Sequence, residues 1–410
     1  MRFLSLFSVS AAAAALVAAD TEFFFYGFGR AGVDSSADAE GGWILVPYIL
    51  ERGSLMANFS IGTPPQELSL VFDTGSSEIW MHSAAYCEAA TECIGGGFNA
   101  SESTTAVEIE DKLFSQSYAD TTHVRGHYVI DTFELGGASL SNQTFALAST
   151  GNVSKGIVGI GFEAIETTKT KYHGILHHLV NQGYIASKLY SLYTNGEDET
   201  GNTVFGSILF GGIDRAKYDG DLVSLPIQPN AKGHYRDLQV NLESISVVDP
   251  NGKTTAFNGS INTPYVLDSG TTYMVLPTQI VENIYDYFDA EYNSTYDIHV
   301  VNNCLDYIAD LQKQEFDNYT INFGFDGITL EMPLENFLSP ITDDCATCKI
   351  HVHSSDNYAI LGDAVLRGAY VVYDFENYVI SLAPSKLDVE EEDIVAVRSG
   401  KNGIAEAVAS

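Results

Sequence analysis

The stretch LVFDTGSS (residues 70–77) decides the fold, and it has a counterpart further along the chain, YVLDSGTT (residues 265–272). Each copy runs from apolar residues that suit a buried strand into an Asp, a hydroxyl residue, a Gly and a second hydroxyl residue. A short apolar segment ending in Gly follows downstream of each copy, IVG (157–159) and ILG (360–362). A strand-and-turn unit repeated at long range predicts two similar lobes.

The two Asp residues of this repeat, Asp73 and Asp268, are the candidate catalytic residues. Each strand would deliver its carboxyl group to the end of a core, where the nearby Gly permits a tight turn and a close approach of another segment. If the lobes meet about a pseudo-twofold axis, the carboxyl groups face each other and share one proton. One group then acts as a base toward water and the other as an acid toward a carbonyl oxygen. This pairing suits peptide hydrolysis without a covalent intermediate.

The rest of the chain has the composition of an all-β protein. Its 36 Gly and 23 Tyr favour strands and turns, and 410 residues with 45% hydrophobic content suffice for one large or two medium domains. Apolar runs between turn residues predict strands at 68–72, 128–135, 207–210, 266–267, 370–375 and 379–382. Apolar spacing predicts helices at 172–183 and 277–289.

The chain is strongly acidic, with 54 Asp and Glu against 20 Lys and Arg and a net charge of −34. This balance argues against nucleic acid, whose phosphates require clusters of basic residues, and against anionic membrane surfaces. An aromatic content of 11% is typical of a globular chain and argues against disorder.

The N-terminus predicts export from the cell. Residues 1–19 combine a basic Arg2, a short apolar run and a small-residue end, which is typical of a secretory signal peptide. A membrane anchor is the alternative, but the run is short for a bilayer span, and no other stretch is apolar enough. Residues 386–410 lack the hydrophobic tail of a GPI signal. We expect a secreted, extracellular protein without a transmembrane segment, and cell-wall association stays open.

Sequons of the N-x-S/T type fit an exported glycoprotein and lie at Asn58, Asn99, Asn142, Asn152, Asn258, Asn293 and Asn318. In an oxidising compartment the 5 cysteines predict two disulfides and one remaining thiol. Cys87 and Cys93 would close a small loop, and Cys304 would reach either Cys345 or Cys348.

Two groups of residues raise the question of a metal site. Cys345, Cys348, His351 and His353 have an alternative interpretation as a zinc cluster, but their spacing is cramped. The histidines of the first predicted helix, His173, His177 and His178, lack the Glu of an H-E-x-x-H site, which favours a solvated or half-buried helix face. We therefore expect no metal and no cofactor.

Together these motifs resemble the pepsin-like aspartic proteases, from about residue 54 to residue 383. The resemblance is carried by IGTPPQ (61–66), DTGSS (73–77) with Ile79 and Trp80, LFGGID (209–214), VLDSGTT (266–272), ILGD (360–363) and VVYD (371–374). The phrases LYSLY (189–193), SILFGG (207–212) and LVSLPI (222–227) are most similar to secreted fungal members of the yapsin and candidapepsin type.

The resemblance implies an all-β, bilobal pepsin-like fold with few short helices and a cleft between the lobes. It implies an N-terminal lobe at 53–220 and a C-terminal lobe at 221–385, with a short propeptide or extension at 20–52 and a tail at 386–410. It also implies a secreted aspartic endopeptidase that acts on polypeptide substrates as a monomer.

The same resemblance assigns roles to the residues of the two turns. Asp73 and Asp268 would be catalytic, and enzymes of this family are the standard example of two carboxyl groups that share a proton. Ser76 and Thr271 would support the carboxyl groups by hydrogen bonds. Thr74 and Ser269 would join the two turns, and Gly75 and Gly270 would lie within the turns.

FSQSYAD (114–120) lies where the family has a hairpin that covers the cleft. Tyr118 would be the tyrosine of this flap, with its hydroxyl at the Trp80 indole, whereas Ala119 replaces the usual Gly. Asp120 would lie at the cleft edge, where a carboxylate can pair with Lys or Arg. Among fungal relatives such an acid favours a basic residue before the cut, so we expect cleavage after Lys or Arg to be enriched.

The resemblance favours Cys348 as the partner of Cys304, which leaves Cys345 free.

The segment 20–52 departs from the family pattern, because family propeptides are basic and these residues are net acidic. We therefore do not expect this segment to clamp onto the acidic enzyme by electrostatic attraction. We expect the enzyme to be active soon after secretion. The acidity of the whole chain suits an enzyme that is active at acid pH. We expect its folded state to become less stable as the pH rises toward neutrality.

Two other classes of function compete with an acid endopeptidase. A silent binding module on the same fold would normally lose one catalytic Asp, and both are present. A glycosidase also uses paired carboxylates, but these need not lie in duplicated D-T/S-G turns. The sequence therefore favours the endopeptidase.

Overall fold

The computed structural model describes residues 36–38, 42–51, 54–89, 93–118, 121–166, 171–197, 204–259, 261–295, 298–310, 315–316, 318–341 and 346–409. The predicted signal peptide, Asp120 and Cys345 lie outside these residues.

The largest sheet in the described residues runs through both halves of the chain in the order β14-β31-β30-β11-β12-β2-β3-β4-β10-β5-β9-β8-β7, with β1 beside β2 and β6 beside β5. Its strands are β1 Ser36–Asp38, β2 Trp43–Glu51, β3 Ser54–Ile61, β4 Gln66–Asp73, β5 Ile79–Ser83, β6 Gly97–Phe98, β7 Val107–Ser117, β8 His123–Leu135, β9 Ala138–Gly151, β10 Ile157–Gly159, β11 Leu189–Glu197, β12 Val204–Phe210, β14 Val223–Pro226, β30 Ala369–Asp374 and β31 Val379–Pro384.

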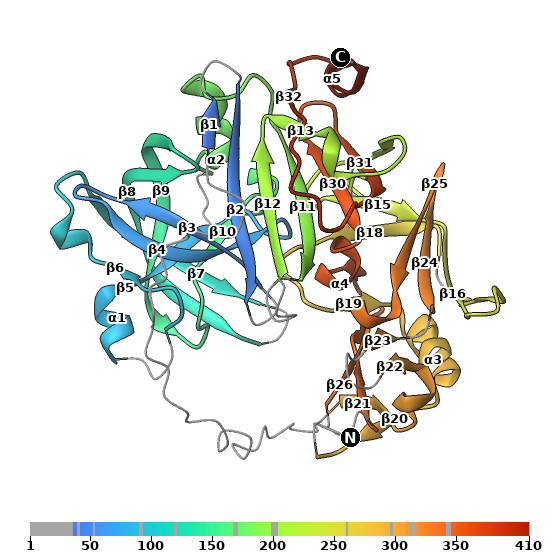
Figure 1. Cartoon of the computed structure of the whole chain (residues 1–410). Helices are drawn as coiled ribbons and strands as arrows, with labels where there is room; N and C mark the ends of the chain where they lie inside the picture. Colours follow the sequence, from blue (N-terminus) through green and yellow to red (C-terminus); the bar gives the residue numbers. More distant parts are fainter. Residues whose placement is uncertain are drawn as a thin grey trace. The chain divides into compact units, whose positions relative to one another are not determined.

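Smaller sheets build the second half. Their strands are β13 Gly212–Asp214, β15 Gln239–Leu242, β16 Ser244–Val248, β17 Thr254–Ala256, β18 Thr263–Leu267, β19 Met274–Leu276, β20 Ala290–Asn293, β21 Ile298–Val301, β22 Ile308–Asp310, β23 Glu315–Phe316, β24 Thr320–Phe325, β25 Ile328–Pro333, β26 Leu338–Pro340, β27 Cys348–Ile350, β28 Val352–Ser354, β29 Ile360–Leu361 and β32 Ile394–Ala396. In Figure 1, β3 to β9 lie on one side of β11 and β12, and β16, β24 and β25 lie on the other. The all-β, two-lobed fold is confirmed.

Helices in the described residues are short. They are α1 Ala84–Ala89, α2 Ile175–Asn181, α3 Thr278–Tyr287, α4 Asp363–Leu366 and α5 Gly403–Ala409, with 3₁₀ turns at η1 Ala100–Glu102, η2 Glu163–Ile165, η3 Arg215–Lys217, η4 Cys304–Tyr307 and η5 Leu334–Asn336. The predicted strands and both predicted helices are present with small shifts at their ends. None of these described helices has the length and apolar character needed to cross a bilayer.

The sequence repeat is also a structural repeat. In the first half, β10 runs parallel to β4, with Gly159 opposite Asp73. In the second half, β29 runs parallel to β18, with Leu361 opposite Leu267. Each of these short strands also pairs antiparallel with the strand after the turn, β5 or β19. Each D-T/S-G turn is therefore held at the end of a buried strand by a second, parallel strand.

Strand β2 falls within the segment 20–52, which the resemblance implies is a short propeptide or N-terminal extension, and it lies in the interior of the large sheet between β12 and β3. Its side chains Ile44, Leu45, Val46 and Tyr48 are buried, and the Tyr48 hydroxyl donates to the Tyr193 carbonyl oxygen at 2.9 Å. Burying one such side chain contributes about 1.5–3 kcal/mol, and whole domains are stable by only about 5–15 kcal/mol. A cut near residue 52 would therefore remove a large part of the stability.

Part of the predicted tail at 386–410 is packed on the fold. Strand β32 pairs antiparallel with β13, and the Arg215 guanidinium holds the Asp393 carboxylate with two contacts of 2.9 Å. Val397 and Ala407 are buried in an apolar cluster with residues of β11, β13 and β30. In Figure 1, β32 and α5 lie beside β13 at the end of the chain.

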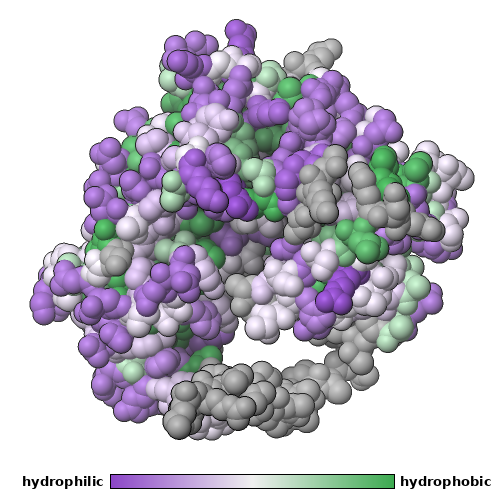
Figure 2. Space-filling view, turned by 180° about the vertical axis from the view of Figure 1, so that it is seen from behind, coloured by the Kyte–Doolittle hydropathy of each residue, from purple (hydrophilic) through white to green (hydrophobic). Residues whose placement is uncertain are grey.

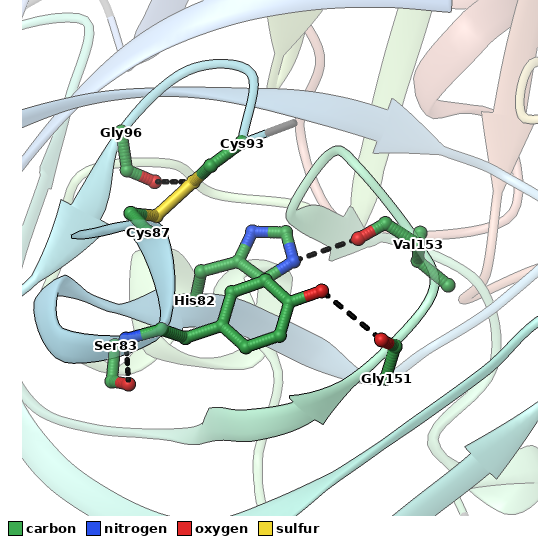
Figure 3. The surroundings of a disulfide bond; sticks show 8 residues. His82, Ser83, Cys87, Cys93, Gly96, Gly151 and Val153 are labelled. Atoms are coloured by element: carbon green, nitrogen blue, oxygen red, sulfur yellow. Dashed lines mark hydrogen bonds between the residues drawn. A yellow bond between two sulfur atoms is a disulfide. The ribbon is translucent and has the colours of Figure 1, made fainter. Parts of the chain in front are cut away.

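Two disulfides are present: Cys87 is joined to Cys93, as the sequence predicts, and Cys304 to Cys348, as the resemblance implies. Figure 3 shows the first one, at the end of α1. Beside it the His82 and Tyr86 rings stack with centroids 4.7 Å apart, and the Tyr86 hydroxyl donates to the Gly151 carbonyl oxygen at 3.1 Å. The disulfide closes the small loop, and the Tyr86 hydrogen bond connects α1 to β9.

The position of β2 makes a prediction about the mature N-terminus. A chain that starts at Gly42 should fold and hydrolyse peptides, whereas a chain that starts at residue 53 should aggregate or melt at a much lower temperature. Thermal melting and peptidase assays on the two truncations check this. Equal stability and activity of both would contradict the structural role of β2.

Candidate active site

Asp73 is the last residue of β4 and points into the turn that follows. Its Oδ1 accepts a hydrogen bond from the Gly75 amide at 2.8 Å, and its Oδ2 accepts one from the Ser76 hydroxyl. The Ile160 amide donates to the Asp73 carbonyl oxygen at 2.9 Å, so the neighbouring strand fixes the backbone as well. Main-chain and side-chain donors together set the orientation of this carboxyl group.

Asp268 directly follows β18 and has matching surroundings. Its Oδ1 accepts from the Gly270 amide at 2.8 Å, and its Oδ2 accepts from the Thr271 hydroxyl at 2.7 Å. Its own amide donates to the Leu361 carbonyl oxygen at 3.1 Å. The hydrogen bonds predicted for Ser76 and Thr271 are therefore both present.

Thr74 and Ser269 join the two turns by four reciprocal hydrogen bonds. The Thr74 amide donates to the Ser269 hydroxyl at 3.1 Å, and the Ser269 amide donates to the Thr74 hydroxyl at 2.9 Å. The Thr74 hydroxyl donates onward to the Leu267 carbonyl oxygen at 2.8 Å, and the Ser269 hydroxyl to the Phe72 carbonyl oxygen at 3.0 Å. Each hydroxyl is both donor and acceptor, and both side chains are buried.

The two glycines allow each carboxyl group to lie against the opposite turn. A Cβ added to Gly75 would lie 2.4 Å from the Asp268 carboxyl carbon, and one added to Gly270 would lie 2.3 Å from Asp73 Oδ1. Any side chain at either position would therefore displace the carboxyl group from the other lobe. The structure brings Asp73 and Asp268 together as the sequence predicted.

Burial and the neighbouring carboxyl group both affect the protonation of Asp73. Asp73 is only 6% exposed and Asp268 8% exposed. Burial, and then the Asp268 carboxyl group beside it, hold the pKa of Asp73 well above its ordinary value. The pair as a whole therefore retains a proton under conditions in which an isolated carboxyl group has lost it.

Tyr118 directly follows β7, and its hydroxyl accepts a hydrogen bond from the Trp80 indole at 2.7 Å. The hairpin turns back beside it, because the Tyr118 amide donates to the Thr122 carbonyl oxygen at 2.9 Å and Thr121 adopts a positive φ of 72°. Trp80, Phe114 and Tyr128 form an apolar cluster beneath. The predicted contact of Tyr118 with Trp80 is present, and Asp120 lies outside the described residues.

Sequence reasoning missed a pair of buried acids behind this cluster, Glu78 and Glu166. Glu78 Oε2 accepts from the hydroxyls of Tyr172 at 3.0 Å and Tyr128 at 3.2 Å. Glu166 Oε2 accepts from the Tyr172 amide at 2.9 Å, while its Oε1 is buried without a hydrogen-bond partner among the described residues. The one signal for Glu78 was an acid placed directly before the apolar residues Ile79 and Trp80.

The environment of Glu166 opposes its ionisation. Burial, the largest cause, raises the pKa of Glu166 to about 8, and the charges of Glu78 and Glu163 act in the same direction. A protonated Glu166 is therefore the form that the folded chain stabilises.

The alternative zinc cluster is not assembled. Cys348 is bonded to Cys304, so it has no thiolate to offer. His351 Nε2 lies 2.8 Å from the Ser339 hydroxyl, and its ring stacks on Tyr273. Cys345 lies outside the described residues.

The geometry agrees with comparisons to known proteins. The model of the eukaryotic aspartyl protease family matches residues 54–385. The probable aspartic-type endopeptidase opsB of Aspergillus fumigatus is 33% identical over 363 residues, which cover 85% of this chain and 72% of that protein. Candidapepsin-1 of Candida albicans is 33% identical over 348 residues, 82% of each chain, and secreted aspartic protease 8 of the same species is 35% identical over 352 residues, 84% of this chain and 79% of the relative.

This chain belongs to the eukaryotic aspartyl protease family. It is an aspartic-type endopeptidase, and its substrates are polypeptides.

The raised pKa of Glu166 predicts a pH-dependent stability. The unfolded chain releases this proton near the ordinary value of 4.5 and the folded chain only near 8, so ionisation favours unfolding as pH rises between them. Glu166→Gln removes this penalty. Its melting temperature should match the wild type near pH 4 and exceed it by a few degrees at pH 8.

Melting curves measured from pH 4 to pH 8 on both proteins give this difference directly. Glu102→Gln, at an exposed position in η1, is the matched control and should follow the wild type throughout. A constant offset between Glu166→Gln and the wild type at every pH would contradict the assignment.

Proposed function

We propose that Asp73 and Asp268 hydrolyse peptide bonds as a pair that shares one proton and activates a water. The observation that carries this proposal is the reciprocal joining of the two turns, which holds each carboxyl group against the glycine of the other turn. The ionised group accepts a proton from water, which attacks the peptide carbonyl carbon. The protonated group donates to the carbonyl oxygen, and the resulting diol collapses as a proton moves to the leaving nitrogen.

The same pair of carboxyl groups supports the proposal that the enzyme is active at acid pH. The mechanism requires one proton on the two carboxyl groups, and the raised pKa of Asp73 keeps that proton bound in acid. As pH rises through this pKa the proton is lost, so activity falls because no acid remains to protonate the carbonyl oxygen.

Removal of either carboxylate tests the pair. Asp73→Asn and Asp268→Asn should each lower peptide hydrolysis at acid pH by about 10³-fold or more while leaving the fold intact. Asp326→Asn, at an exposed turn position, is the control and should retain activity. A statine-type inhibitor should bind the wild type, and substantial hydrolysis by Asp73→Asn would refute the proposal.

We also infer that the enzyme is secreted. The signal peptide predicted at residues 1–19 supports this, and so do relatives whose names describe secreted aspartic proteases. A monomer fits the face drawn in Figure 2, which is mostly hydrophilic with separate apolar patches. N-glycans at the exposed Asn142, Asn152 and Asn318 fit the same route.

Asp120 is the proposed source of a preference for basic residues before the cut. Its position two residues after Tyr118 would place a carboxylate beside the substrate, where it can pair with Lys or Arg. Asp120→Ala should lower cleavage after Lys and Arg selectively in a peptide library. The control Asp326→Ala should keep the wild-type profile, and an unchanged Asp120→Ala profile would end this idea.

A further inference from the structure

Glu78 lies on the segment that connects the first catalytic turn to the Trp80 indole. It comes after Asp73 and its turn and shortly before Trp80 in the chain, and it is only 4% exposed. Its carbonyl oxygen accepts a hydrogen bond from the Gly159 amide at 3.0 Å, while the Ile160 amide donates to the Asp73 carbonyl oxygen. Two adjacent residues at the end of β10 therefore fix the backbone of both acids.

Two tyrosine hydroxyls converge on the Glu78 carboxyl group. The hydroxyls of Tyr172 and Tyr128 donate to its Oε2 at 3.0 Å and 3.2 Å. The Tyr172 hydroxyl also accepts a hydrogen bond from the Ile79 amide at 3.0 Å. Because an amide can only donate and a hydroxyl carries one hydrogen, that hydrogen is directed to Glu78. Glu78 thereby orients the hydroxyl that holds the peptide group leading into Trp80.

The rings of these tyrosines also support Trp80 from behind. Tyr128 packs edge-on against both Tyr172 and Phe114, with centroids 5.8 Å apart in each pair, and Phe114 lies 6.3 Å from Trp80. Trp80 is fully buried, and its indole donates to the Tyr118 hydroxyl. Close-packed side chains transmit a displacement to their neighbours. A shift of Tyr128 would therefore reach Trp80 and its contact with Tyr118.

The second buried acid, Glu166, contacts the same tyrosine differently. Its Oε2 accepts from the Tyr172 amide at 2.9 Å, whereas Glu78 accepts from the Tyr172 hydroxyl. Glu166 therefore holds the backbone of Tyr172 but does not orient the hydroxyl that bonds the Ile79 amide. This difference makes Glu166 a matched comparison for Glu78.

We propose that Glu78 is a positioning residue for peptide hydrolysis, which orients two tyrosine hydroxyls and so keeps the Trp80 indole in place for Tyr118. The inference rests on the proposed function of the catalytic pair and on Tyr118 lying over the cleft, as the resemblance implies. A displacement of about 1 Å in a group that positions the substrate can cost about 10²-fold in rate. Loss of the Glu78 acceptor should therefore lower activity although this buried side chain acts only through its neighbours.

Hydrolysis of a peptide substrate at pH 4 gives the first test. Glu78→Leu removes both acceptor oxygens and should lower kcat/KM by about 10-fold or more. Glu78→Gln keeps one carbonyl acceptor and should recover a large part of that loss. Glu166→Gln is the control from the same cluster and should keep the wild-type kcat/KM.

The fluorescence of Trp80 gives a readout that does not depend on hydrolysis. The chain has 2 tryptophans, so a Trp43→Phe background leaves Trp80 as the only one. In this background Glu78→Gln should change the emission maximum or the acrylamide quenching of Trp80, and Glu166→Gln should not. This measurement can fail even if the catalytic pair works as proposed, and it can succeed even if the pair does not.

A double-mutant cycle with Tyr118→Phe separates positioning from a general loss of stability. If Glu78 acts through Tyr118, adding Glu78→Gln to Tyr118→Phe should lower kcat/KM little further. Tyr172→Phe removes only the bridging hydroxyl and should behave in the same way, which keeps the test open if Glu78→Leu does not fold. Additive losses in the cycle, or unchanged Trp80 fluorescence in Glu78→Gln, would overturn the proposal.

Discussion

The reciprocal hydrogen bonds between Thr74 and Ser269 are the interaction on which the rest of the site depends. They are buried, and each hydroxyl has both an amide donor and a carbonyl acceptor from the other turn or its strand. An unpaired hydroxyl at this depth would cost about 1–3 kcal/mol, so the two turns are strongly favoured in this one relative position. The placement of the Asp73 and Asp268 carboxyl groups against each other follows from that position.

Local sequence was sufficient for the parts of the fold that depend on short-range patterns. The apolar strands leading into Asp73 and Asp268, the turn hydroxyls and the small cysteine loop were all predicted, because each follows from residues adjacent in the chain. The role of β2 was not, since its apolar run can be recognised as a core strand only when its neighbours β12 and β3 are known. The same holds for β32, whose partner β13 lies far away in sequence.

The pKa shifts of buried groups could not be predicted from the sequence either. The net charge suggested a chain suited to acid, yet individual buried groups act in opposite directions. Burial raises the pKa of Glu166 to about 8, which favours the fold at low pH, and it lowers the pKa of His351 to about 3, which favours the fold above the ordinary histidine value. Neither shift can be read from composition, because both depend on which side chains the fold removes from water.

The close approach of each carboxyl group to the glycine of the opposite turn, Gly75 or Gly270, decides whether one lobe can form the site without the other. Each carboxyl group is packed against the backbone of the opposite lobe, so neither lobe contains a complete half of the site. A lobe expressed by itself would present its carboxyl group to bulk water and lose the neighbouring carboxyl group of the other lobe. The smallest unit that contains the whole carboxyl pair is therefore the two assembled lobes, and the positions of Gly75 and Gly270 accept no side chain without moving one of the acids.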